Sequence, residues 1–369
     1  MTGRGRPKEI DGAELLEREV VAIQTSYGEA VLRGKVILVT GAAGSIGSEL
    51  VRQLLNYRPA CVIALDTNET GLFDLSESLR THPSTARLKL YIGDITDKRS
   101  MAQLFTTRQP QVIFHVAAYK HVPLLEAFPD QAVRTNVLAT YNLCRLAREH
   151  GVERFIFIST DKAADPTGVM GASKRVGEMI IQSLAQEQGW KTCFCAVRFG
   201  NVIGSRGSVV PIFTQQIQQG GPITITDPRA TRYFMTIPES CGLVILAAAI
   251  AEQGKLYLLD MGKPVRIIDL ATKMVRLHGL RVGQDIPIVY TGLRPGERLH
   301  ETLIAVDEEV IPTAHSKIIA ILPRECGQTP LIHEWMQLLA YSLEHEDVAQ
   351  LRMHLFALVQ GMRMEQLSH

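Results

Sequence analysis

Three consecutive polar residues, Thr160, Asp161 and Lys162, could do chemistry together. A hydroxyl, a carboxylate and an amine side by side can supply three proton-transfer groups to one reaction. They follow an apolar run at residues 154–158, which predicts a buried strand. Ligands of open α/β sheets bind at the carboxyl ends of strands. The plainer interpretation is a polar turn after a strand, but a second motif upstream favours the chemical one.

That second motif is the glycine-rich stretch Thr40-Gly-Ala-Ala-Gly-Ser-Ile-Gly47, which lies between a predicted strand at 35–40 and a predicted helix at 48–56. Glycines in such a turn let the backbone approach a pyrophosphate, and the helix N-terminus supplies N–H donors. The placement between strand and helix predicts a dinucleotide site rather than a turn with incidental glycines. The predicted contacts are Gly41, Gly44, Ser45, Ile46 and Gly47.

Residues at the ends of the next strands extend this predicted site. Asp66 ends the second strand, where a carboxylate can accept hydrogen bonds from the adenine ribose and would repel a 2′-phosphate. The sequence therefore favours NAD over NADP. Asp94 and Ile95 follow the third strand, near the expected adenine, although Asp94 could equally cap a helix. The small residues expected to pass under the cofactor are Ala117 and Ala118.

The elements that must position these residues alternate along the chain. Strands are predicted at 35–40, 61–65, 88–92, 111–116, 154–158 and 192–197, with helices at 48–56, 70–79, 100–106, 130–150 and 173–188 between them. This alternation predicts an α/β fold with a doubly wound parallel sheet. We expect a polar, helical N-terminal segment at 1–33, an NAD-binding domain at 34–200, a partly interleaved substrate-binding lobe at 201–325 and a helical tail at 326–369.

Composition excludes several classes of protein. The 369 residues carry 39 Lys and Arg against 38 Asp and Glu, so the chain is not a strongly basic nucleic-acid binder. Hydrophobic residues make up 46%, enough to bury a core. We expect no membrane span, because no apolar run reaches the length that a bilayer requires. No secretory signal and no cysteine pair at zinc spacing are present, so we expect a cytoplasmic protein with reduced thiols and no metal.

The glycine motif resembles that of the extended short-chain dehydrogenases/reductases, which have a Rossmann fold and normally carry Tyr-x-x-x-Lys. The matching stretch here is Met170-Gly-Ala-Ser-Lys174. The lysine is present, but a methionine replaces the tyrosine, and a thioether cannot shuttle a proton. This difference argues against an ordinary dehydrogenase or epimerase mechanism.

A more specific resemblance rests on Ser159-Thr-Asp-Lys-Ala163, Asp165-Pro166, Met170-Gly-x-x-Lys174 and Thr291-Gly-Leu-Arg-Pro-Gly-Glu297. These stretches resemble the UDP-N-acetylglucosamine 4,6-dehydratases of bacterial polysaccharide biosynthesis, over about residues 34–304. The resemblance implies a hydro-lyase that uses NAD, takes UDP-N-acetylglucosamine and forms a homo-oligomer through helices at 132–148 and 174–186. Methionine at 170 is similar to members that retain the configuration at C5, which implies UDP-2-acetamido-2,6-dideoxy-α-D-xylo-hexos-4-ulose as product.

The resemblance also implies roles for the residues. Hydride leaves C4 for NAD and later returns to C6, with water lost across C5 and C6 in between. Thr160 would polarise the 4-hydroxyl, Lys162 would take the C5 proton and Asp161 would protonate the leaving hydroxyl, although the last two roles could be exchanged. Their surroundings would then have to lower the pKa of Lys162 and raise that of Asp161. Lys174 would hold the nicotinamide ribose. The implied substrate contacts are Lys120, His121, Asn201, Arg206, Ser208, Arg294 and Glu297.

Two other functions remain open. A UDP-hexosamine epimerase would use the same cofactor and keep the C6 hydroxyl. A non-catalytic dinucleotide-binding module would explain the missing tyrosine, but it would have no need of Thr160, Asp161 and Lys162. Residues 14–21 resemble the stretch that joins a membrane region to the catalytic part in longer relatives. The chain is therefore expected to be either a natural soluble form or a catalytic segment.

Overall fold

The computed structural model describes residues 12–16, 26–189, 191–322, 332–345 and 347–362. Parts of the predicted segments at 1–33 and 326–369 lie outside these residues. Within them, no helix has the length and apolar character needed to cross a bilayer. No group of His, Cys, Asp and Glu side chains in the same ranges is arranged to hold a metal ion.

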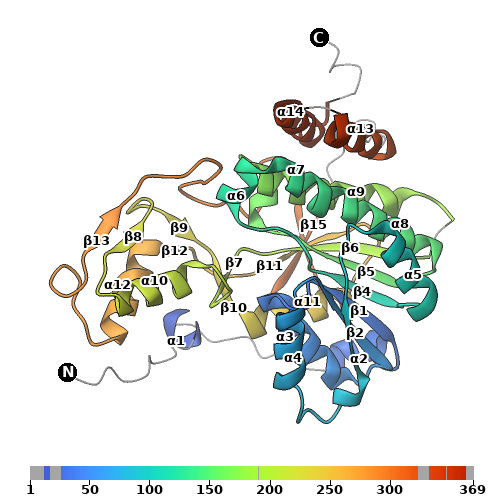
Figure 1. Cartoon of the computed structure of the whole chain (residues 1–369), viewed down its shortest axis with the longest axis horizontal. Coiled ribbons are helices and arrows are strands. Elements are labelled where there is room, and N and C mark those ends of the chain that lie inside the picture. Colours follow the sequence, from blue (N-terminus) through green and yellow to red (C-terminus); the bar gives the residue numbers. More distant parts are fainter. Residues whose placement is uncertain (1–11, 17–25, 190, 323–331, 346, 363–369) are drawn as a thin grey trace.

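A nine-stranded sheet forms the centre of the chain (Figure 1), in the order β14-β15-β11-β6-β5-β4-β1-β2-β3. All neighbouring strands are parallel except at β15, which is antiparallel to both β11 and β14. The strands are β1 (Val36–Thr40), β2 (Cys61–Asp66), β3 (Leu88–Ile92), β4 (Val112–His115), β5 (Arg154–Ile158), β6 (Cys193–Arg198), β11 (Leu256–Leu259), β14 (Val310–Pro312) and β15 (Ile318–Ile321). The predicted doubly wound α/β fold is confirmed.

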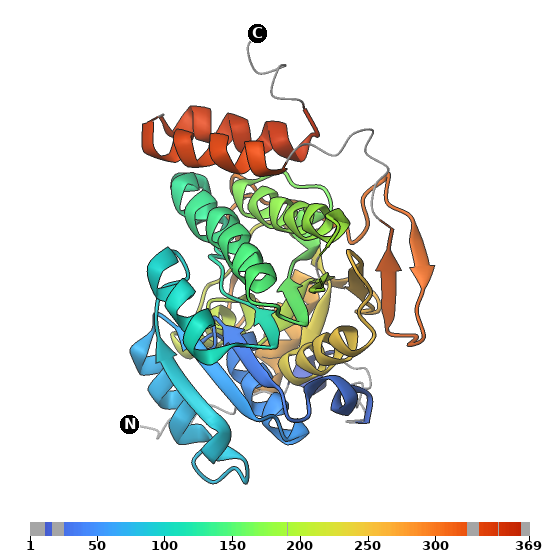
Figure 2. The same cartoon turned by 90° about the vertical axis from the view of Figure 1, so that its right-hand side faces the viewer.

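Helices cover both faces of this sheet, because the central strands are apolar on both sides and need a partner layer on each. The layers are visible from the side in Figure 2. One layer contains α2 (Ser26–Leu32), α3 (Ser45–Leu54), η1 (Leu55–Tyr57), α4 (Glu69–Ser78) and α11 (Ile237–Ala249). The other contains α5 (Lys98–Arg108), α6 (Val122–Ala127), α7 (Pro129–Gln131), η3 (Ala132–Ala139), α8 (Thr140–Glu149) and α9 (Val169–Gln186). A short turn, η2 (Thr85–Arg87), precedes β3.

The region predicted as one helix at 130–150 is three segments in succession, of which η3 is a π-helix. Its wider turn places Asn136 beside the loop after β4, where the amide oxygen of Asn136 accepts from the Tyr119 N–H at 2.9 Å. The Asn136 amide also donates to Ser173 Oγ of α9 at 3.0 Å. Hydrophobic spacing could not indicate this change of period, since the buried pairs 132/136 and 133/137 have a four-residue spacing that an α-helix also gives.

A smaller lobe has a hydrophobic core of its own. It is built from β7 (Asn201–Ile203), α10 (Val209–Gln218), β8 (Ile223–Ile225), β9 (Thr231–Arg232), β10 (Phe234–Thr236), β12 (Val265–Arg266), α12 (Ile267–Leu277) and β13 (Ile288–Tyr290). The short N-terminal helix α1 (Gly12–Leu16) adds Leu15 to this core. In Figure 1 the lobe lies beside the sheet. Among the residues that the structure describes, none of its strands joins the nine-stranded sheet.

The last two helices, α13 (Ile332–His345) and α14 (Val348–Val359), form a hairpin over the outer face of α9 and η3. Trp335, Leu339 and Leu355 are almost fully buried and belong to the same hydrophobic cluster as the helices beneath them. The hairpin also reaches α6, because Arg352 donates to Glu126 Oε2 at 2.5 Å. It therefore packs on the helices that the resemblance assigns to an oligomer interface.

Candidate active site

A cleft of about 650 Å³ opens at the carboxyl ends of the parallel strands. Its walls come from the loops after β1, β2, β3, β4, β5 and β6 and from the start of the small lobe. The predicted site residues that line it are Gly41, Gly44, Ser45, Ile46, Asp66, Asp94, Ile95, Ala117, Ala118, Lys120, His121, Thr160, Lys162, Met170, Lys174, Asn201 and Ser208. Its size is typical of a site for a small-molecule ligand or cofactor.

The glycine loop after β1 is shaped for close backbone approach. Gly41 has a φ of +69°, and a Cβ there would lie 2.7 Å from the Ala117 nitrogen. A Cβ on Gly47 would lie 2.1 Å from the Gly41 carbonyl oxygen, so this glycine packs the loop from behind and does not line the cleft. Helix α3 begins at Ser45 without a side-chain cap. Its N-terminus can therefore receive a phosphate, and the loop fits a dinucleotide.

Asp66 is fixed at the edge of this cleft by two backbone groups. Its Oδ2 accepts from the Ala43 N–H and its Oδ1 from the Asn68 N–H, each at 2.9 Å. Both oxygens keep a lone pair for a ribose hydroxyl. Asp94 also lines the cleft, and the alternative that it caps the following helix is wrong, because the N-cap of α5 is Asp97.

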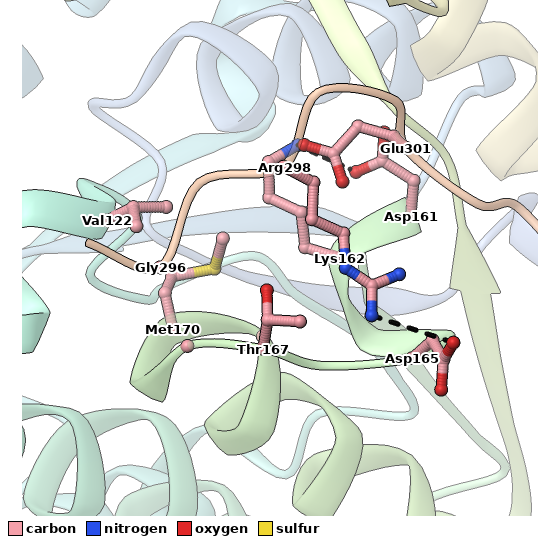
Figure 3. Close-up of a pocket in the computed structure, with 11 residues that line it drawn as sticks. Val122, Asp161, Lys162, Asp165, Thr167, Met170, Gly296, Arg298 and Glu301 are labelled. Carbon is pink, nitrogen blue, oxygen red and sulfur yellow. Dashed lines mark hydrogen bonds and ion pairs between the residues drawn. The ribbon is translucent and has the colours of Figure 1, made fainter. Parts of the chain in front are cut away.

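The three predicted proton-transfer groups form one hydrogen-bonded chain at the end of β5, where Thr160 caps the short turn η4 (Asp161–Ala163). Figure 3 shows Asp161 and Lys162 of this chain. The Thr160 hydroxyl donates to Asp161 Oδ1 at 2.8 Å, and Lys162 Nζ donates to the same oxygen at 3.0 Å. Thr160 and Lys162 line the cleft, whereas the Asp161 side chain is fully buried behind them. Among the described residues, its Oδ2 finds no hydrogen-bond partner.

The expected lowering of the Lys162 pKa is wrong. Burial on its own favours the neutral amine, but the carboxylates of Asp161 and Glu301 outweigh it and raise the pKa of Lys162 above its usual value. Glu301 Oε1 lies 3.2 Å from Lys162 Nζ. The sequence could not indicate this second carboxylate, because it comes from the distant loop after β13.

Met170 and Lys174 lie one turn apart on α9 and face the same cleft. The Met170 side chain is buried and offers no ionisable proton. Lys174 Nζ lies 4.0 Å from the centre of the Phe157 ring. Burial strips water from this ammonium group and lowers the pKa of Lys174 to about 7, although the Glu178 carboxylate opposes the change.

The shifted pKa of Lys174 predicts that stability depends on pH. Between about 7 and 10.5 the folded chain holds Lys174 neutral, while the unfolded chain holds it protonated. The unfolded state therefore binds more protons, and the free energy of unfolding rises with pH by up to about 1.4 kcal/mol per pH unit. Denaturant unfolding of wild type and Lys174→Met across this window measures the effect. Equal slopes for the two proteins would contradict a lowered pKa at Lys174.

Four buried charged residues lie behind the strand end that leads into η4. Arg198 Nη2 lies 2.7 Å from Glu178 Oε2, and Arg198 Nη1 lies 2.7 Å from Glu308 Oε2. Arg175 contacts both carboxylates, and Ser159 Oγ donates to Glu178 Oε1 at 2.6 Å. The two arginines lower the pKa of Glu178 to about 2 despite its burial. We did not predict this cluster from the sequence, although Glu178 on the buried face of a helix was a signal for it.

The predicted substrate contacts after β4 and β7 come together. Lys120 Nζ donates to the Arg206 carbonyl oxygen at 2.8 Å, and the Arg206 N–H donates to Ser45 Oγ at 3.0 Å. Burial, and then the charge of Arg206, lowers the pKa of Lys120. Burial and Lys120 likewise lower the pKa of His121. Arg206 itself is exposed beside the cleft.

The structure does not bring Arg294 and Glu297 to the cleft wall. Arg294 is exposed, and its backbone N–H donates to Glu297 Oε2 at 3.3 Å within the same turn. Their neighbours instead line a small cavity beside η4, and Figure 3 shows this cavity. Arg298 and Glu301 line that cavity together with Asp161, Lys162 and Met170. We did not predict Arg298 and Glu301 as site residues from the sequence, because neither belongs to a motif that the prediction used.

Comparisons of this chain with a family model and with curated proteins agree on one family. A family model described as "Polysaccharide biosynthesis protein" matches residues 37–323. Capsular polysaccharide biosynthesis protein CapD of Staphylococcus aureus is 45% identical over 82% of this chain and 50% of its own length. The probable polysaccharide biosynthesis protein EpsC of Bacillus subtilis is 43% identical over 84% of this chain and 52% of its own. The chain thus spans about half the length of these two curated relatives.

Epimerases and dehydratases are also among the similar proteins. A UDP-glucose 4-epimerase of Rickettsia bellii is 34% identical over 74% of this chain and 79% of its own length. Among solved structures, Pen from Bacillus thuringiensis has a TM-score of 0.72 at 32% identity, over 80% of this chain and 90% of that one. DesIV, a dTDP-glucose 4,6-dehydratase from Streptomyces venezuelae solved with NAD, has a TM-score of 0.64 at 26% identity, over 73% and 88% of the chains.

Proposed function

The chain belongs to the polysaccharide biosynthesis protein family, and on that premise we propose that it catalyses NAD-dependent 4,6-dehydration of UDP-N-acetylglucosamine with retention at C5. The observation that carries the proposal is the hydrogen-bonded chain of Thr160, Asp161 and Lys162 in a cleft where Met170 replaces the usual tyrosine. Such a site has the proton-transfer groups for elimination but lacks the tyrosine of a simple dehydrogenase.

NAD is the cofactor that the cleft fits. The loop from Gly41 to Gly47 and the start of α3 suit the pyrophosphate, and the Asp66 carboxylate suits an unphosphorylated ribose. When bound, NAD would accept hydride from C4 of the sugar and return it to C6. In its ammonium form, Lys174 would hold the nicotinamide ribose. In this proposal residues 34–200 bind the cofactor and residues 201–325 provide most contacts to the UDP-sugar.

The first proton step would use Thr160. Because Met170 has no proton to exchange, the 4-hydroxyl proton passes to Thr160 Oγ1, which gives its own proton to Asp161 Oδ1 across 2.8 Å. Asp161 is then a carboxylic acid. Its burial behind Thr160 means that it reaches the sugar through this hydroxyl. The same hydrogen bond can later carry the proton back.

Lys162 would remove the C5 proton during elimination and would return a proton to C5 when C6 is reduced. Because the carboxylates of Asp161 and Glu301 outweigh burial and raise the pKa of Lys162, ammonium is its resting form, and the step uses the fraction that is the free amine. This amine takes the C5 proton that the 4-keto group acidifies, while the C6–O bond breaks and the Asp161 proton leaves through Thr160 as part of water. This step leaves Lys162 as ammonium beside the Asp161 carboxylate. When C6 is reduced, Lys162 returns a proton to C5 and the pair regains its starting charge. Atoms balance, with water as the only loss.

The test is incubation of the purified chain with UDP-N-acetylglucosamine, without added cofactor at first, followed by mass spectrometry and proton NMR. We expect a product lighter by one water, with a new C6 methyl signal. In deuterium oxide, one deuteron should appear at C5, and borohydride reduction followed by ring couplings should show a retained C5. A product of unchanged mass with altered couplings would overturn the proposal in favour of epimerisation, the activity named for the Rickettsia bellii relative. No turnover with NAD and several UDP-sugars would favour a binding module.

A further inference from the structure

Glu301 lies against the turn η4, which contains Asp161 and Lys162, although it is distant from them in the sequence (Figure 3). Its carboxylate is 3% exposed, and Oε1 lies 3.2 Å from Lys162 Nζ. Pairing of the 299–301 segment with β9 fixes it there. The Thr231 N–H donates to the Leu299 carbonyl at 3.1 Å, and Arg232 Nη1 donates to the same carbonyl at 3.1 Å. Arg232 Nε also lies 3.4 Å from Glu301 Oε1.

Lys162 is thereby held between two carboxylates. Its Nζ lies 3.0 Å from Asp161 Oδ1 on one side and 3.2 Å from Glu301 on the other. The remaining charges around it are Arg232, which faces the same carboxylate of Glu301, and the pair Arg298–Asp165 across the small cavity. Lys162 lines both that cavity and the large cleft, so its amine is the group through which Glu301 can affect the sugar.

We propose that Glu301 is a positioning residue for the acid–base chemistry of Lys162, which it holds at the cleft wall and stabilises in the ammonium form. This inference rests on the proposed function. In that reaction the free-amine form of Lys162 becomes an ammonium group when it takes the C5 proton. A fixed carboxylate beside it therefore stabilises the state that elimination produces. Glu301 itself lines only the small cavity, so it acts through Lys162 and not on the sugar.

The first experiment measures the charge of Lys162 without any turnover. An amine is acetylated by acetic anhydride only as the free base, and the Lys162 side chain is 24% exposed. Wild type, Glu301→Gln and the control Asp165→Asn are labelled across a pH series, and the peptide that contains Lys162 is quantified by mass spectrometry. Asp165 lines the same cavity but pairs with Arg298 at 3.6 Å. We expect the pH of half-labelling to fall by about 1 unit in Glu301→Gln and to stay in place in Asp165→Asn.

A second variant is expected to shift the pH of half-labelling at Lys162 in the opposite direction. Removing the positive charge of Arg232 in Arg232→Gln is expected to raise the pH of half-labelling at Lys162, because this charge opposes protonation. The result does not depend on whether Glu301→Gln folds. Unchanged half-labelling in a folded Glu301→Gln, or a fall with Arg232→Gln, would overturn the inference.

Kinetics separate this inference from the proposed function. With UDP-N-acetylglucosamine, Glu301→Gln is expected to shift the acidic limb of kcat/KM to lower pH by about 1 unit and to lower kcat about tenfold with KM unchanged. Asp165→Asn should keep the wild-type profile. If wild type dehydrates the substrate but the acidic limb of kcat/KM is not shifted in Glu301→Gln, only the role of Glu301 is overturned. If wild type does not dehydrate the substrate but the pH of half-labelling at Lys162 still falls in Glu301→Gln, only the proposed function is overturned.

Discussion

Asp161→Asn is expected to lower kcat for dehydration by about 10²–10⁴-fold while leaving the bound NAD and the fold intact. The amide oxygen can still accept from the Thr160 hydroxyl at 2.8 Å, so the turn keeps its shape. An amide, however, cannot take the proton from Thr160 and return it to the leaving hydroxyl. Product formation, followed as loss of water from UDP-N-acetylglucosamine, measures the effect.

Asp165→Asn is the matched control, because it removes a carboxylate from the same cavity that contacts Arg298 instead of Thr160. It should retain wild-type kcat within about twofold. An Asp161→Asn protein with wild-type kcat would show that the proton of the 4-hydroxyl leaves by another route. A protein that has lost its NAD would show that Asp161 supports the cleft and not the chemistry.

Arg198→Met is expected to lower the free energy of unfolding by about 3–5 kcal/mol. Arg198 is fully buried and pairs with both Glu178 and Glu308, so its loss leaves two buried carboxylates with Arg175 as their remaining cation. Chemical denaturation of the two proteins measures the difference. The exposed pair Arg80–Glu77, at 3.8 Å, is the control, and Arg80→Met should cost less than about 1 kcal/mol.

The same buried cluster makes the free energy of unfolding depend on pH. The pKa of Glu178 falls from 4.5 to about 2 on folding, so its stabilising contribution is complete above 4.5 and is lost as pH falls towards 2. Arg198→Met removes part of this dependence. Equal stability of wild type and Arg198→Met would mean that Arg175 alone compensates both carboxylates.

The sequence predicted the central strands well, because each is an apolar, β-branched run between turn residues. The run at 154–158 coincides with β5 (Arg154–Ile158), and the glycine stretch lies where a strand meets a helix. Contacts within one motif, such as Thr160 with Asp161, follow from adjacency along the chain. The strands, the glycine turn and the contacts between neighbouring residues could therefore be predicted from the sequence.

The remainder depends on residues that only the fold brings together. Glu301 acts with Asp161 to reverse the expected pKa direction of Lys162, yet no spacing in the sequence connects Glu301 with Lys162. The change to a π-helix at η3 is equally hidden, because it alters the turn and not the hydrophobic pattern. Arg294 and Glu297 show the converse, since a motif marked them and the fold leaves them away from the cleft.

The hairpin of α13 and α14 matters for anyone who wishes to work with a shortened protein. The family match ends at residue 323, before the hairpin begins. A chain cut at that limit would lose Trp335, Leu339 and Leu355 and bare the apolar side of α9, the helix that carries Met170 and Lys174. Such a fragment would keep every motif and still be prone to aggregation. The boundary of recognisable sequence is therefore not the boundary of the folding unit.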